Sequence, residues 1–136
     1  HVDLLILKGV VLQELGRAED AEEAFSTVRQ EVESEETFLL SRSQTYLRTG
    51  KSEPALTDAE AAIEVNETSA YGYYLRGTAL SGLNRPVEAL ESLEKASQLA
   101  EAQGNTELQG MARVQIANLS MMMGAPQNPA ATHEGE

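Results

Sequence analysis

Apolar side chains recur along the chain at the spacing of an α-helix. Near the start, Leu5, Gly9, Leu12 and Leu15 follow one another at steps of four, three and three residues, which places them on one face of a helix. Gly16 comes next and is suited to end that helix, because glycine readily adopts the left-handed conformation of a helix C-terminus. A second helical stripe follows at Ala21, Ala24, Phe25 and Val28. The pattern therefore predicts two antiparallel helices joined by a tight turn.

The whole pattern repeats every 34 residues without a gap, and repetition at this period is typical of helical-repeat solenoids. It defines three units, at 2–35, 36–69 and 70–103. Two register positions hold only small residues, one with Gly9, Ser43 and Gly77 and the other with Ala21, Ala55 and Ala89. Since two helices approach closely only where the contact residues are small, we expect these two positions to meet inside each unit.

The three units predict six helices, near 2–15, 18–32, 36–49, 52–65, 69–83 and 86–102. A seventh helix is predicted at 105–123, because Asn105 and Thr106 are good N-cap residues and a helical apolar pattern continues to Met123. This helix is expected to act as a cap, since the last unit of a solenoid needs its apolar face covered. Residues 1–123 thus form one repeat domain. The segment 124–136, with two Pro and two Gly, is predicted to be a disordered tail or a linker.

Composition narrows the range of functions. The net charge of −12, from 10 Lys and Arg against 22 Asp and Glu, argues against a nucleic-acid partner, which requires a basic face. There is no cysteine, and the only histidines are His1 and His133, so we expect no metal, no cofactor and no histidine-based catalysis. The sequence has no apolar run long enough for membrane insertion. The cytoplasm is the favoured compartment, and the start at His1 rather than Met suggests a processed or excised piece.

The charges also follow the repeat. Acidic residues gather in the second helices and at the junctions between units, where we expect them on the outer, solvated side. They include Glu22, Glu23, Glu33, Glu67, Glu88, Glu91, Glu94 and Glu101. Lys8, Arg42 and Arg76 share one register beside the small position. We expect these long cationic side chains to lie along helix surfaces and to pair with nearby carboxylates.

The third unit carries the most distinctive residues. Tyr73–Leu80 reads YYLRGTAL and Gly82–Leu90 reads GLNRPVEAL. With its three in-register copies, the chain resembles the tetratricopeptide repeat family, although Glu33, Glu67 and Glu101 stand where the family usually has a proline. The resemblance implies an all-α fold, a right-handed superhelical solenoid of three antiparallel helix pairs plus a C-terminal capping helix. It also implies a protein-interaction scaffold rather than an enzyme.

In such a solenoid the first helix of each unit lines the concave face. Asp3 is expected on this face, together with our candidate partner contacts. These candidates are Ile6, Val10, Leu40, Gln44, Arg48, Tyr71, Tyr74 and Thr78. The two tyrosines stand out, because Tyr combines a large apolar body with a polar tip. For Ile6, Val10 and Leu40 the alternative is that they pack against neighbouring helices.

Members of the resembled family that bind chaperones hold a C-terminal carboxylate with Lys, Asn and Arg side chains from three first helices. The matching positions here hold Ile6, Val10, Ser41, Tyr71 and Leu75. None of these supplies the cation or amide that such a clamp needs. We therefore expect no binding of the acidic C-terminal tails of Hsp70 and Hsp90.

The leading interpretation is a scaffold that binds a peptide or helix of a partner protein in its concave groove. Two alternatives stay open. The chain is an assembly element that self-associates through the solenoid ends, with Met121–Met123 as an adaptable apolar contact, or it is a regulatory domain of a larger enzyme or complex.

Overall fold

The computed structural model describes residues 1–124, and within that range the chain forms seven α-helices and no strand. The helices are α1 (Val2–Glu14), α2 (Ala18–Glu31), α3 (Glu35–Arg48), α4 (Ser52–Val65), α5 (Ala70–Gly82), α6 (Pro86–Ala102) and α7 (Thr106–Met122). Every predicted helix end lies within one residue of the observed end. The predicted tail falls, apart from Gly124, outside the described residues.

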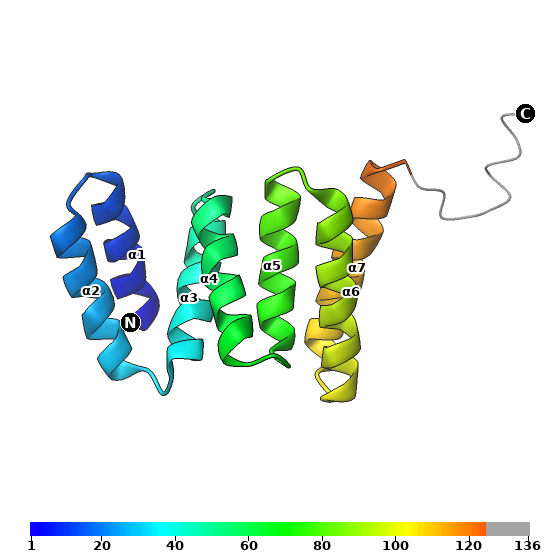
Figure 1. Ribbon diagram of the computed structural model, residues 1–136, viewed down its shortest axis with the longest axis horizontal. Coiled ribbons are helices and arrows are strands. Elements are labelled where there is room, and N and C mark those ends of the chain that lie inside the picture. Colours follow the sequence, from blue (N-terminus) through cyan, green and yellow to red (C-terminus); the bar gives the residue numbers. More distant parts are fainter. Residues whose placement is uncertain (125–136) are drawn as a thin grey trace, which may run out of the picture.

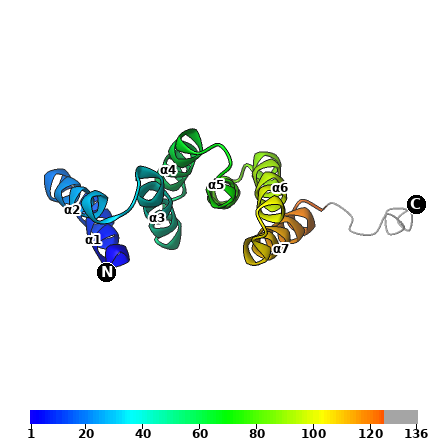
Figure 2. The ribbon, with the colours of Figure 1, turned by 90° about the horizontal axis from the view of Figure 1, so that it is seen from below.

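The helix pairs follow one another in chain order along the long axis of the molecule, with α2 at the outer end and α7 next to α6 (Figure 1). Consecutive helices run in opposite directions. In the view turned by 90°, α2, α4 and α6 line one side of the row and α1, α3 and α7 the other (Figure 2). The predicted all-α solenoid of antiparallel helix pairs is confirmed.

The two helices of each pair are joined by the same kind of tight turn. Gly16, Gly50 and Asn84 hold one register and all have a positive φ, of 76°, 77° and 60°. The next residue in each turn donates its N–H to a carbonyl five residues earlier, as Arg17 does to Leu12 at 2.9 Å. This bond is the mark of a Schellman turn, which requires a residue that tolerates the left-handed conformation, and glycine and asparagine do so best.

Side-chain caps fix the starts of α3, α5 and α7. Ser34 Oγ accepts from the N–H of Thr37 at 3.2 Å, Ser69 Oγ from Gly72 at 3.0 Å, and Asn105 Oδ1 from Leu108 at 3.1 Å. Each bond satisfies a backbone donor that has no partner in the first turn of a helix. The junction between one pair and the next is thereby fixed as firmly as the turn inside a pair.

The two helices of a pair meet at the small register position. A Cβ atom on Gly77 would lie 2.6 Å from Leu93 Cγ and 3.1 Å from the carbonyl oxygen of Ala89. Gly9 faces the ring of Phe25, where a Cβ atom would lie 2.7 Å from Cζ. The predicted contact with the alanine position is thus present in the third unit, and a large side chain on the second helix adds to it.

The second unit makes the same contact between its two helices with different residues. Ala59 holds the register of Phe25 and Leu93, and Ser43 holds that of the glycines. Ser43 is fully buried and its hydroxyl donates to the carbonyl oxygen of Ala55 at 2.8 Å. A smaller residue on the second helix therefore leaves room for a serine on the first, and the backbone of α4 satisfies the serine hydroxyl.

A buried ion pair joins the two helices of the second unit, α3 and α4. Arg42 Nε and Nη2 donate to the two carboxylate oxygens of Asp58 at 2.7 and 2.8 Å, and the Asp58 side chain is only 5% exposed. The Arg42 guanidinium lies 4.7 Å from the ring centre of Phe25 in α2 and 4.8 Å from that of Phe38 in α3. Burial works against the charge of Arg42, but the hydrogen bond and charge of Asp58 outweigh it and raise the pKa of Arg42 above its ordinary value.

The first prediction concerns this ion pair. Arg42→Met should lower the free energy of unfolding by about 3–5 kcal/mol, because it leaves the Asp58 carboxylate buried without a cation. The double variant Arg42→Met/Asp58→Leu should recover much of that loss, since no buried charge remains. Urea denaturation followed by circular dichroism measures both. The control is Arg17→Met, which removes an exposed ion pair with Asp20 and should change stability by less than about 1 kcal/mol. Equal losses in Arg42→Met and Arg17→Met would contradict the role given to the pair.

Candidate functional site

The row of helices curves, and its hollow side is lined by the first helices of the pairs and by α7 (Figure 2). We call this side the inner face. It brings together side chains from α1, α3 and α5, which are 34 residues apart in the sequence. A curved solenoid presents an extended surface of this kind to a partner. The inner face is therefore the candidate functional site.

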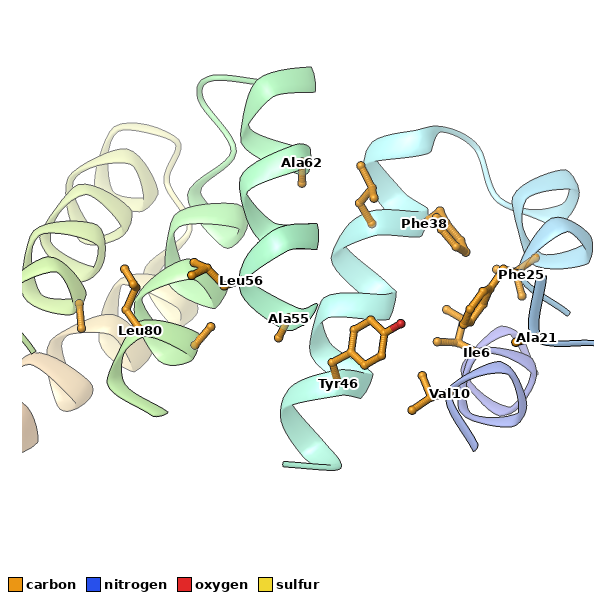
Figure 3. Close-up of a cluster of buried hydrophobic side chains, with 14 of the residues drawn as sticks. Ile6, Val10, Ala21, Phe25, Phe38, Tyr46, Ala55, Leu56, Ala62 and Leu80 are labelled. Carbon is orange, nitrogen blue, oxygen red and sulfur yellow. The ribbon is translucent and has the colours of Figure 1, made fainter. Parts of the chain in front are cut away.

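Ile6 and Val10 are not on the surface of this face. Both side chains are fully buried, and they point from α1 into the core beside Phe25 and Tyr46 (Figure 3). Neighbouring first helices pack against each other, and Ile6 and Val10 lie on the side of α1 that faces α3. The candidate contacts Ile6 and Val10 are thus corrected to core residues, because α3 covers them. Leu40, at the same register in the second unit, is half-buried and also packs against the core.

The equivalent residues of the third unit, Tyr74 and Thr78, are half-buried and meet α7. Gln115 Nε2 of α7 donates to Tyr74 Oη at 2.7 Å, and the Thr78 hydroxyl lies 3.4 Å from Gln115 Oε1. The same register position therefore contacts the next helix along the inner side in every unit. Gln44, its member in α3, is half-buried as well. These three side chains support the solenoid and are only partly accessible to a partner.

Tyr71 is half-buried and remains in contact with the inner face. Its ring stacks on Tyr74, with ring centres 5.9 Å apart and planes 9° apart. Burial raises the pKa of Tyr71 above its ordinary value, and the charges of Arg48 and Asp3 also act on its phenol, the first lowering and the second raising the pKa. Tyr71 on α5 therefore lies within the electrostatic reach of one cation from α3 and one carboxylate from α1.

Arg48 and Asp3 are both exposed, and they line one hollow of about 450 Å³ between α1 and α3. Leu4 and Leu7 add apolar surface to the same hollow. Leu4 and Leu7 were not among the contacts predicted from the sequence. Their register partners in the other units include Phe38 and Leu75, which are core residues, whereas Leu4 and Leu7 are exposed.

Most acidic side chains of the second helices are exposed, as expected, whereas Asp58 is buried against Arg42 and Glu88 is half-buried. The exposed group includes Glu22, Glu23, Glu91, Glu94 and Glu101. Asp3 is the carboxylate that the inner-face hollow contains. The negative charge of the chain is therefore concentrated away from the inner face, whose accessible groups are mixed in character.

No helix within residues 1–124 is long and apolar enough to cross a membrane. In the same range no group of three or more His, Asp or Glu side chains is placed to hold a metal ion.

Stacked helix pairs with an accessible inner face define the chain as a helical-repeat solenoid. Residues 70–103 match the family model of the tetratricopeptide repeat, and these are the residues of the third unit found in the sequence. The third unit is therefore similar to a tetratricopeptide repeat.

Several solved structures share this fold. PcrH from Pseudomonas aeruginosa superimposes with a TM-score of 0.65 at 17% identity, over 88% of this chain and 91% of that one. The tetratricopeptide domain of Sgt2 from Aspergillus fumigatus gives 0.62 at 19% identity, over 94% and 84%. The first such domain of Spaghetti (RPAP3), bound to an HSP90 peptide, gives 0.61 at 19% identity, over 90% and 93%. A comparison with curated protein sequences gave no match. At these identities the likeness concerns the fold.

Proposed function

We propose that the chain is a protein-interaction scaffold, without enzymatic activity, that binds a peptide or helix of a partner protein along its inner face. The observation that carries the proposal is the hollow between α1 and α3 that Asp3 and Arg48 line, with Tyr71 of the next first helix, α5, half-buried against Tyr74. The first helices of three successive units thereby contribute side chains to the inner face. An extended or helical segment that crosses the solenoid can contact all three.

The chemistry of these groups indicates the kind of segment. Tyr71 offers a flat apolar ring with a polar tip, which is a common anchor at interfaces. Asp3 and Arg48 offer opposite charges, and Leu7 offers an apolar contact in the same hollow. We infer a ligand segment with an apolar anchor flanked by charges of both signs. A strongly acidic or strongly basic tail fits this surface less well.

We also propose that the chain lacks a clamp for a terminal carboxylate. Of the matching positions, Ile6, Val10 and Leu75 are buried core residues. Ser41 and Tyr71 carry hydroxyl groups and no charge. Arg48 is the cation of the inner-face hollow, and Asp3 in the same hollow opposes a second anion. A lone arginine beside a carboxylate is a poor receptor for a tail that carries several negative charges.

The second prediction tests the inner face. Peptides selected for binding to this chain from a random display library should lose affinity at least about tenfold with Tyr71→Ala, and about threefold or more with Arg48→Ala, if these side chains are anchors. Isothermal titration measures the dissociation constants, and the melting temperature shows that each variant is folded.

The matched control is Glu91→Ala, an exposed substitution on α6 away from the inner face. It should leave affinity unchanged. Selected peptides whose affinity depends on neither Tyr71 nor Arg48 would overturn the proposed site.

The third prediction tests the missing clamp. The peptide SRMEEVD, which is the HSP90 peptide bound in the Spaghetti (RPAP3) structure, should show no saturable binding to this chain up to about 1 mM, an affinity weaker than about −4 kcal/mol. Fluorescence anisotropy of the labelled peptide gives the measurement. Saturable binding with a dissociation constant of a few micromolar would show that the chain holds such a tail.

A further inference from the structure

One face of α1, at the first end of the described solenoid, is apolar and exposed, and its residues Leu4 and Leu7 also line the inner-face hollow. It is formed at helical spacing by Leu4, Leu7, Val11 and Leu15, which we call the α1 stripe. Leu4 and Leu15 are 68% and 66% exposed. The first three members line an open hollow of about 560 Å³ whose other walls are mostly apolar. Such a continuous exposed patch marks an interaction site more often than scattered apolar residues do.

Most of the same register positions are buried in the other two units, whereas Ser41 and Leu83 are half-buried and Thr49 is exposed. In the second unit, Leu4 and Val11 correspond to Phe38 and Thr45, which are 0% and 1% exposed. The preceding pair covers them, since Phe25 of α2 meets Phe38 edge to face with ring centres 6.0 Å apart. The buried equivalents in the third unit are Gly72, Leu75 and Ala79. The α1 stripe is therefore the face on which this solenoid stacks one helix on the next.

The other end of the solenoid has a comparable face. On α7, Met111, Val114 and Met121 lie on one side, with Asn118 between them, and we call these four residues the α7 stripe. Val114 and Met121 are 61% and 66% exposed. The opposite side of α7 is buried, through Leu108, Ala112 and Leu119. Both ends of the described row of helices thus carry an exposed apolar stripe, each on a single helix and of nearly the same length.

The two stripes match when the helices run antiparallel, which is the sense that consecutive helices already have in this fold. Helical spacing then places Leu4 opposite Met121, Val11 opposite Val114 and Leu15 opposite Met111. Asn118 falls opposite Leu7 and next to Lys8, whose ammonium can donate to the amide oxygen. Glu107 falls near Arg17, so the charges at that edge are opposite in sign.

We propose that the α1 stripe of one copy packs against the α7 stripe of a second copy, so that copies of this chain associate head to tail. This contact covers an α1 stripe and an α7 stripe together. A symmetric contact between two α1 stripes would leave both α7 stripes exposed. A head-to-tail contact leaves a free stripe at each end of the assembly, and it forms open chains. The contact of one helix with one helix is small, so the association is weak and depends on concentration.

Salt gives this contact a distinctive signature. Each copy has a net charge of −12, so two copies repel each other at low ionic strength. Salt screens that repulsion beyond about 10 Å at 0.1 M, and the apolar contact is not weakened by salt. Association should therefore become stronger as salt is added, whereas a contact formed mainly by ion pairs would become weaker.

Sedimentation velocity of the whole chain tests the proposal. From about 10 µM to about 1 mM the weight-average mass of the wild type should rise at least about 1.5-fold, as expected for a dissociation constant in this range. Leu4→Glu/Val11→Glu, which charges the α1 stripe, should be monomeric alone. Val114→Glu/Met121→Glu, which charges the α7 stripe, should also be monomeric alone. An equimolar mixture of the two variants should form a dimer that does not grow, because only one intact contact is possible.

The matched control is Val87→Glu, which charges a 62% exposed valine of α6 outside both stripes and should associate like the wild type. Circular dichroism confirms that each variant is folded. A wild type that stays monomeric to about 1 mM would overturn the proposal. So would self-association of the α7 variant alone, which would indicate a symmetric α1 contact, or a mixture that stays monomeric while the wild type associates.

Discussion

The close approach of the two helices in each pair is the constraint on which the rest of the molecule depends. Gly9 and Gly77 leave just enough room for Phe25 and Leu93, and the second unit pairs Ser43 with Ala59 instead. Side-chain size on one helix is thus compensated by side-chain size on the other, and the spacing of the pair is kept. Because a packed interior tolerates neither overlap nor a void, this match sets the geometry that every unit repeats.

Once the pairs are fixed, the register decides which side chains are free. Positions that meet the next first helix are covered, as at Ile6 and Val10, and the position of Tyr71 is left partly open. Apart from Asp58, most acidic side chains of the second helices remain exposed. The same packing leaves α1 and α7 each with an exposed apolar stripe. The inner face, the outer charge and the apolar ends are therefore three consequences of one packing scheme.

The helices could be predicted from the sequence because their signals are local. Apolar spacing shows each helix, and Gly16, Gly50 and Asn84 show each turn. The surface of the inner face was harder to predict, because a first helix contacts its own partner and the neighbouring units as well. Val10, Gln44 and Thr78 share one register position but differ in polarity, and this variety is typical of a position that faces solvent. Their variety instead reflects different neighbours, since Thr78 meets Gln115 of α7. The pairing of Arg42 with a carboxylate was predicted, but the buried partner Asp58 was not identified, although Arg76 and Ser92 repeat the 16-residue spacing.

A double-mutant cycle at Gly77 and Leu93 tests the size matching most directly, with free energies of unfolding from urea denaturation. Gly77→Ser alone should cost about 1–3 kcal/mol through overlap with Leu93, and Leu93→Ala alone about 2–5 kcal/mol through the cavity it leaves. Gly77→Ser/Leu93→Ala recreates the residues of the second unit. It should be more stable than the sum of the single losses implies, by about 1–3 kcal/mol. Losses that add within about 0.5 kcal/mol would show that the two positions do not determine each other.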